Sequence, residues 1–199
     1  MEEMNGMNAD GVAFAGRLSP QLIVDLLGVA GTWAIDVIEG LAPSGKARFP
    51  VSWAGESESQ NWMDTGRDYT ERWHHQAQIR DATNRPGLLE PRWMETLLEF
   101  SLRALPLAYA GVLAPRSTAV TLRVTGETSG QWSIVRGDDR WEVVRGAPAR
   151  PAALVRVSTD DAWRLFYNAL SPARLAARVV VEGDAALAGP LLRARSVIL

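Results

Sequence analysis

The stretch Val120-Thr121-Leu122-Arg123-Val124-Thr125 decides the fold, because here the spacing of apolar residues changes from a helical period to strict alternation. Further short segments rich in β-branched and aromatic residues follow at 132–134, 141–143 and 154–157. Turn-forming Gly and Asp residues at 126–130 and 137–139 separate the first of these segments. We therefore expect an antiparallel sheet of short strands after Pro115.

Helices and one more strand follow these segments in the sequence. Thr159 is a suitable N-cap for a helix that ends before Ser171-Pro172, and Gly183-Asp184 precedes a final apolar helix. Val179-Val180-Val181 has the composition of a strand. The second half of the chain is therefore predicted to be a small α+β domain.

Upstream of Pro115 the apolar residues keep a helical period. Ser19-Pro20 supplies an N-cap and a first-turn proline, which predicts a helix over residues 20–39. Further helices are expected at 61–81 and 91–113, and Pro106 should kink or divide the latter. The fold class is α+β, with a helical domain at 1–114 and an α+β domain at 115–199.

Charge and composition narrow the function classes. The 21 basic and 23 acidic residues give a net charge of −2, without the one-sided basicity that nucleic acid or an anionic membrane selects. The absence of Cys means that any thiol chemistry must use an external thiol. The N-terminus lacks a signal-like pattern, and charges or Gly interrupt each apolar stretch before the roughly 18 residues of a membrane span. We expect a cytoplasmic protein with neither a nucleic-acid nor a membrane partner.

Adjacent histidines, His74 and His75, mark the strongest candidate for chemistry. Glu71 and His75 are four residues apart, so on a helix their side chains lie one turn apart on one face and can share a divalent ion. An ordinary surface contact between the two side chains explains the same spacing. Spacing alone leaves both interpretations open.

A family resemblance rests on the segment Arg67-Asp68-Tyr69-Thr70-Glu71-Arg72-Trp73-His74-His75-Gln76-Ala77-Gln78-Ile79-Arg80-Asp81. It resembles the third-helix motif of the mycothiol-dependent maleylpyruvate isomerase family. Val181-Glu182-Gly183-Asp184-Ala185-Ala186-Leu187-Ala188 is similar to the small, sterol-carrier-like C-terminal domain of that family. The resemblance implies a DinB-like helical bundle followed by a sterol-carrier-like domain.

The resemblance also implies a site and a reaction. Glu71 and His75 would bind a divalent metal, usually zinc, with His74 as the second choice of ligand. Asp68 or Gln78 would orient the ligands. The cofactor thiol would be mycothiol, and the activity isomerisation of, or thiol transfer to, a small electrophile.

Arg80 is the candidate catalytic residue in this scheme, because its guanidinium could meet a substrate carboxylate. A salt bridge near the end of the helix is the alternative role for Arg80.

The sequence also departs from the family pattern. No His precedes His74, so the family's first metal ligand and about two helices of the bundle are missing, and we expect an N-terminally truncated, partial bundle. Apolar helix faces left uncovered would favour a homodimer. Two functions remain: a metal- and mycothiol-dependent enzyme, inactive if the missing ligand is not replaced, or a non-catalytic small-ligand-binding or protein-interaction module.

Overall fold

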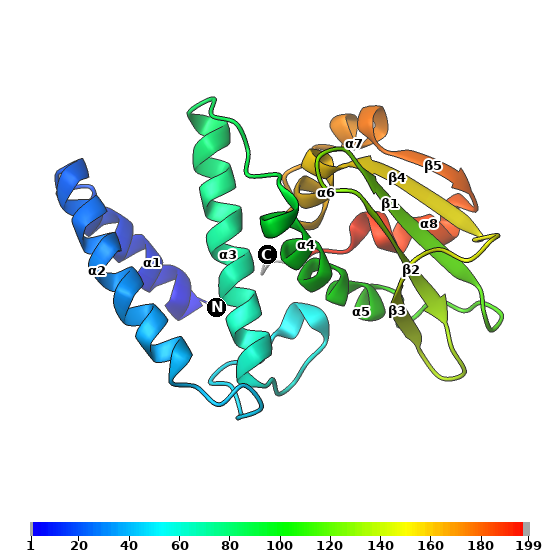
Figure 1. The fold of residues 1–199 in the computed structure, drawn as a ribbon, viewed down its shortest axis with the longest axis horizontal. Helices are drawn as coiled ribbons and strands as arrows, with labels where there is room; N and C mark the ends of the chain where they lie inside the picture. Colours follow the sequence, from blue (N-terminus) through cyan, green and yellow to red (C-terminus); the bar gives the residue numbers. More distant parts are fainter. Residues whose placement is uncertain (1, 197–199) are drawn as a thin grey trace. The chain divides into compact units, whose positions relative to one another are not determined.

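The computed structural model describes residues 2–196 and divides into two compact units, Met1–Gly45 and Lys46–Leu199 (Figure 1). The expected domain boundary at 114/115 lies inside the second unit. There the helices before Pro115 share a hydrophobic core with the strands that follow it. Each unit is described by itself.

The first unit contains two helices, α1 (Glu2–Ala15) and α2 (Pro20–Glu39). The α2 helix begins as the sequence predicts, since the Ser19 hydroxyl accepts a hydrogen bond from the Leu22 backbone N–H and Pro20 occupies the first turn. Gly40 caps its C-terminus. The α1 helix was not predicted from the sequence. None of the residues of α2, all of which the structure describes, is buried.

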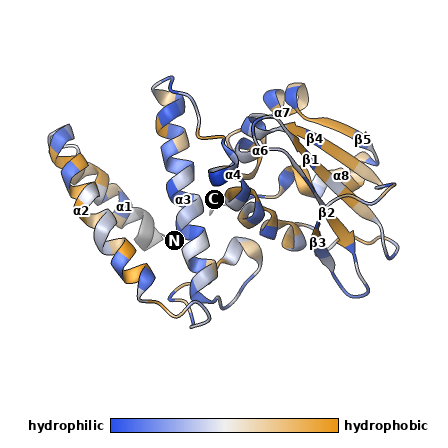
Figure 2. Ribbon diagram, viewed as in Figure 1, coloured by the Kyte–Doolittle hydropathy of each residue, from blue (hydrophilic) through white to orange (hydrophobic). Residues whose placement is uncertain are grey.

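Helix α2 also passes a length and composition test for a membrane span. It has 20 residues with a hydropathy of 1.6, and it is coloured mainly as hydrophobic in Figure 2. The sequence-based expectation that interruptions rule out a span is thereby revised, because isolated acids and glycines do not lower the average over a full helix enough. Core helices of soluble proteins pass the same test, and the expectation of no membrane partner stays a prediction.

The second unit begins with helices. In chain order these are the 3-10 helix η1 (Ser52–Ala54), α3 (Asn61–Ala82), α4 (Pro91–Ser101), the 3-10 helix η2 (Leu102–Ala104) and α5 (Leu105–Ala108). The helix expected at 91–113 is thus divided, and its last part ends five residues early. Pro106 lies in the first turn of α5, where its missing backbone N–H removes no helical hydrogen bond.

A five-stranded sheet follows, in the order β3-β2-β1-β4-β5. Its strands are β1 (Ala119–Thr125), β2 (Gly130–Arg136), β3 (Trp141–Arg145), β4 (Ala153–Ser158) and β5 (Val180–Gly183). The sheet is mixed and not wholly antiparallel as expected, because β1 pairs in parallel with β4. The connection 146–152 carries the chain from the end of β3 back across the sheet, so that β4 enters in the direction of β1.

Three helices complete the second unit: α6 (Thr159–Phe166), α7 (Pro172–Arg178) and α8 (Ala185–Arg193). The N-cap of α6 is Ser158, one residue before the expected Thr159, and the Thr159 hydroxyl instead donates to the Thr128 carbonyl at 2.6 Å. The α7 helix was not predicted. The α+β fold class is confirmed.

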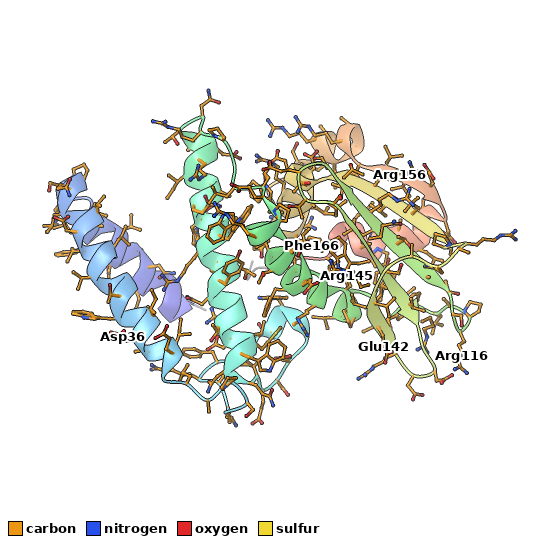
Figure 3. All side chains as sticks on the ribbon, viewed as in Figure 1. Asp36, Arg116, Glu142, Arg145, Arg156 and Phe166 are labelled. Carbon is orange, nitrogen blue, oxygen red and sulfur yellow. The ribbon has the colours of Figure 1, made fainter. Side chains whose placement is uncertain are left out.

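The core of the second unit lies between the sheet and its helices. Phe166, labelled in Figure 3, is fully buried, as are Leu97 and Leu122 from α4 and β1. The Tyr109 hydroxyl donates to the Leu187 carbonyl at 2.6 Å and joins the end of α5 to α8. Burial raises the pKa of this phenol, which keeps it a hydrogen-bond donor.

Candidate functional site

Glu71 and His75 lie next to each other on α3, as their spacing predicts. The His75 Nε2 atom is 3.8 Å from a Glu71 carboxylate oxygen. The other ring nitrogen, Nδ1, is 3.0 Å from the Gln78 side-chain oxygen, so Gln78 does lie where it can orient the ring. The His75 side chain is 66% exposed, and the pair therefore faces solvent rather than an enclosed cavity.

The acidic residues that could have completed a metal site are held by arginines. Asp64 accepts from Arg67 at 2.7 Å, and Asp68 accepts from Arg72 at 2.7 Å. Among the described residues, no group of three His, Cys, Asp or Glu side chains is placed to bind one metal ion. A catalytic zinc needs three protein ligands, so the donors present here do not fit such a centre. The zinc and mycothiol expectations stay predictions from the resemblance, and no reaction step is derived through them.

His74 lies in the interior of the second unit, where its side chain is buried. The exposed His75 ring stacks beside it, with ring centroids 5.3 Å apart and an angle of 23° between the ring planes. The His74 ring packs on Tyr167 with a centroid distance of 4.8 Å and near Trp163 at 6.3 Å. Burial, together with the neighbouring His75, lowers the pKa of His74 to about 4. Neither ring nitrogen has a hydrogen-bond partner among the described residues.

Arg80 ties α3 to the loop that follows it. Its guanidinium donates to the Gln76 side chain at 2.8 Å and to the Pro86 carbonyl at 2.9 Å. Arg80 follows Glu71 by nine positions on the helix, which corresponds to about 13 Å along the axis. The contacts of Arg80 thus support a structural role, and its catalytic role stays a prediction.

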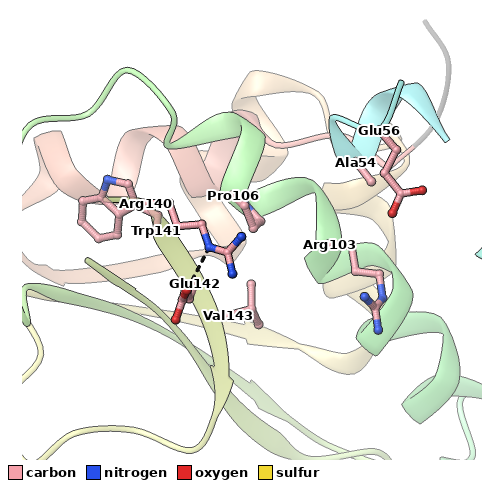
Figure 4. Close-up of a pocket in the computed structure, with 8 residues that line it drawn as sticks. All are labelled: Ala54, Glu56, Arg103, Pro106, Arg140, Trp141, Glu142 and Val143. Carbon is pink, nitrogen blue, oxygen red and sulfur yellow. Dashed lines mark hydrogen bonds and ion pairs between the residues drawn. The ribbon is translucent and has the colours of Figure 1, made fainter. Parts of the chain in front are cut away.

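A second candidate site lies beside β3, at residues that belong to no motif recognised in the sequence. A recess of about 520 Å³ is lined by Arg103, Pro106, Arg140, Trp141, Glu142 and Val143, with Ala54 and Glu56 at its side (Figure 4). We call it the wide recess. Its apolar part comes from Pro106 on α5 and from Trp141 and Val143 on β3.

A smaller recess of about 240 Å³ adjoins the wide recess. We call it the narrow recess; it is lined by Glu99, Leu102, Arg103, Trp132, Val143 and Arg145. The two recesses share Arg103 and Val143, and we refer to them together as the β3 groove. The cross-strand pairing of Trp132 with Arg145 sets an indole beside a guanidinium on neighbouring strands.

The charges of the β3 groove are mostly paired. Arg140 donates to Glu142 at 2.9 Å, an ion pair drawn in Figure 4, and Arg145 donates to Glu99 at 3.1 Å. Arg103 is the one guanidinium of the groove without an ion pair among the described residues. Its carbon Cζ instead lies 4.9 Å from the centre of the Trp62 ring.

The sequence contains a weak signal for this groove. Arg103 is the single charged residue in the apolar run Phe100-Ser101-Leu102-Arg103-Ala104-Leu105. A charge that interrupts an apolar helix marks a position that faces solvent or a ligand. Arg103 contacts Trp62 on α3 and lines the narrow recess together with Trp132 on β2 and Val143 on β3. A helical pattern cannot identify such neighbours.

Known proteins add only a distant likeness. No family model and no curated protein matches this sequence. Among solved structures, the chain is similar to sterol carrier protein 2 like 2 from Aedes aegypti, with 20% identity and a TM-score of 0.37 over 48% of this chain and 93% of that one. It is also similar to a UbiJ-SCP2 ubiquinone synthesis protein, with 18% identity and a TM-score of 0.34 over 50% and 82% of the two chains. The sterol carrier protein 2 of Yarrowia lipolytica gives 16% identity and 0.31 over 37% and 68%.

These neighbours are sterol carrier domains, the kind of domain expected for residues 115–199. They lend nothing to the DinB-like or isomerase part of the expectation. TM-scores below 0.5 do not establish a function.

Proposed function

We propose that the second unit is a non-catalytic binding module that holds a small amphipathic molecule in the β3 groove. The observation that carries this proposal is the wide recess, in which the apolar side chains of Pro106, Trp141 and Val143 lie beside charged groups. Its volume of about 520 Å³ falls in the range typical of small-molecule sites.

The alternative of a metal- and thiol-dependent enzyme receives less support from the described residues. Glu71 and His75 supply two donors, His75 is exposed, and Asp64 and Asp68 are already paired. The groove needs none of these residues. A binding module is therefore the better-supported function.

A blocking substitution tests the proposal. Ala54→Trp puts a large ring at the side of the wide recess, and Ala173→Trp puts the same ring on the exposed surface of α7 as a matched control. Titration calorimetry of the full chain with decanol should detect a site that Ala54→Trp weakens at least tenfold and Ala173→Trp leaves unchanged.

The comparison of the two variants isolates the groove, because the exposed apolar side chains of α2 are the same in both. Equal decanol binding by the two variants, with equal thermal stability, would contradict the proposal. No decanol binding by the unmodified chain would contradict it as well.

A further inference from the structure

We infer that the β3 groove binds an extended peptide segment whose main chain pairs with the open edge of β3. The segment runs antiparallel to β3 and carries an acidic side chain opposite Arg103 and a basic side chain opposite Glu56. This inference rests on the proposed function and deepens it, because it names the chemical class of the amphipathic ligand.

Strand β3 lies at an edge of the sheet, with β2 as its one neighbour in the order β3-β2-β1-β4-β5. Antiparallel strands exchange backbone hydrogen bonds at every second residue. At one end of the pairing, the Gly137 N–H donates to the Arg140 carbonyl at 2.8 Å. At the other end, the Gly146 N–H donates to the Gln131 carbonyl at 2.7 Å. The even-numbered residues of β3 therefore turn their backbone polar groups toward β2, and the odd-numbered residues turn theirs away from the sheet.

The open edge of β3 presents the backbone N–H and C=O groups of Trp141, Val143 and Arg145. No backbone group of another described segment bonds to them. The groups of successive odd-numbered residues are spaced by about 6.4–6.8 Å, the length of two residues of strand. Another extended main chain repeats its donors and acceptors at the same spacing, whereas a hydrocarbon chain has neither. The edge thus matches a peptide.

The wide recess runs along this edge. Trp141, Glu142 and Val143 are consecutive residues, and all three line the recess. Successive side chains of a strand point to opposite faces of the sheet, so a recess that reaches all three borders the edge at which the two faces meet. Figure 4 shows Arg103 and Glu56 on the other side of the recess, across from Glu142 and Val143. Because of this far wall, the recess fits one extended segment better than the edge of a second folded chain.

The charges on the far wall give the segment a sequence and a direction. Arg103 and Glu56 form no ion pair among the described residues, although Glu56 accepts a hydrogen bond from Ser59. Arg103 lines both recesses together with Val143, whereas Glu56 lines only the recess that includes Trp141. An acid near Val143 and a base near Trp141 would complement these charges. Antiparallel pairing is the more stable arrangement, and an antiparallel segment meets Val143 before Trp141, so its acid precedes its base by two residues.

The probe for this site is an acetylated and amidated peptide of sequence Val-Thr-Glu-Thr-Lys-Thr-Val. Its Val, Glu and Lys residues share one face of the extended chain, and its Thr residues share the other. Titration calorimetry of the full chain at pH 7 and low salt should detect one bound peptide per chain. The peptide with Glu and Lys exchanged has the same composition and should bind about threefold to tenfold more weakly, because both exposed ion pairs become repulsive.

Backbone methylation of the probe tests the pairing itself. Directly opposed residues of an antiparallel pair point their side chains to the same face, so the Glu and Lys residues of the peptide are the ones whose N–H groups reach β3. A probe methylated at those two backbone nitrogens should lose at least about tenfold in affinity. A probe methylated at the two Thr residues that flank Glu is the matched control and should keep its affinity within about threefold, because those N–H groups point away from β3.

Val143→Pro tests the same pairing from the protein side. Proline removes the outward N–H of this residue and leaves the ladder to β2 intact, as edge strands tolerate. Val143→Ala is the matched control, because it shortens the side chain and keeps the N–H. The peptide should bind at least about tenfold more weakly to Val143→Pro than to Val143→Ala. Arg103→Gln should reduce the preference between the two charge orders, and Arg150→Gln, at an exposed residue that lines neither recess, should keep it.

The outcomes separate this inference from the proposed function. Binding of decanol without binding of the peptide would overturn the peptide and leave the binding module standing, and absence of both would overturn both. Equal losses from the two methylation patterns would overturn the strand pairing. Tighter binding of the exchanged peptide would overturn the antiparallel direction, and equal binding of the two peptides would overturn the selection by charge. A two-chain mass in sedimentation that Val143→Pro reduces to one chain would assign the edge to a second copy and overturn the peptide.

Discussion

Helix α2 is apolar over most of its surface and helix α4 is amphipathic, yet only α4 builds a core. The α4 helix buries Met94, Leu97, Leu98 and Ser101, whereas α2 buries none of its residues. The apolar residues of α4 share one side of the helix, and the sheet and the other helices of the second unit cover that side. Hydrophobic sequence is thus not sufficient for burial, because a helix also needs a surface that matches it.

The exposure of α2 is large. Leu27, Trp33 and Val37 are each more than 60% exposed, and Asp25 and Asp36 are the acids in the middle part of the helix. Apolar surface of this extent favours association. The homodimer expected from the sequence stays a prediction, since α2 alone does not identify its partner.

The largest effect expected from this comparison is the loss of stability caused by a cavity in the core. Leu97→Ala removes a fully buried side chain of α4 and should lower the free energy of unfolding by about 2–5 kcal/mol. Leu27→Ala makes the same change on α2, where the side chain is 66% exposed. It should change the free energy of unfolding by less than about 0.5 kcal/mol. Urea unfolding followed by Trp fluorescence measures both, because seven of the eight Trp residues lie in the second unit.

A large loss of stability in Leu27→Ala would break the comparison, since it would mean that α2 is buried in solution. Repeating the measurement at lower protein concentrations would then show whether another copy of the chain covers α2. A loss that grows as the protein is diluted would point to an interface between copies.

A smaller effect comes from His74, the buried titratable group of α3. Its pKa of about 4 lies below the ordinary value of 6.5, so between these values the unfolded chain binds more protons than the folded one. Stability should therefore fall as the pH is lowered from about 6.5 to 4, by at most about 3 kcal/mol, and this loss should level off below pH 4.

His74→Phe should remove this part of the pH dependence, and the difference from the unmodified chain cancels the carboxylates that titrate in the same range. His75→Gln, which replaces an exposed ring, is the matched control. This variant should retain most of the pH dependence. Identical pH profiles for His74→Phe and the unmodified chain would show that His74 is not buried in solution.

The sequence predicted the positions of helices and strands better than it predicted how they pair and pack. The Ser19-Pro20 start of α2, the alternation of β1 and the acidic N-cap Asp184 of α8 are local signals, and the structure has all three elements. The parallel pairing of β1 with β4 depends on the path of the connection 146–152, which no local pattern encodes. Pro106 predicted the break after α4 but not that α5 would end at Ala108.

For the candidate sites, too, local spacing was predictable from the sequence and contacts between distant segments were not. The spacing of Glu71 and His75 correctly places the two side chains together, because helix geometry is local. The spacing could not show that the neighbouring Asp64 and Asp68 form ion pairs with Arg67 and Arg72. The β3 groove joins Arg103 to strands 30 to 40 residues later in the sequence, and contacts at that separation carry no periodic signal.

The smallest effect compares helix caps in the two units. The Asp184 carboxylate accepts from the Ala186 and Leu187 backbone N–H groups at 2.9 and 3.1 Å, and Ser19 makes the equivalent contact with Leu22 at 3.2 Å. Loss of such a cap costs about 0.5–2 kcal/mol of helix stability. Asp184→Ala should therefore shift the fluorescence-detected unfolding of the second unit, because α8 packs into its core.

Ser19→Ala should leave that transition unchanged and lower only the helical circular dichroism signal, because α2 contributes no buried residue. If the two substitutions shift the fluorescence transition equally, α2 must unfold together with the second unit, and the contrast between the two regions would no longer hold.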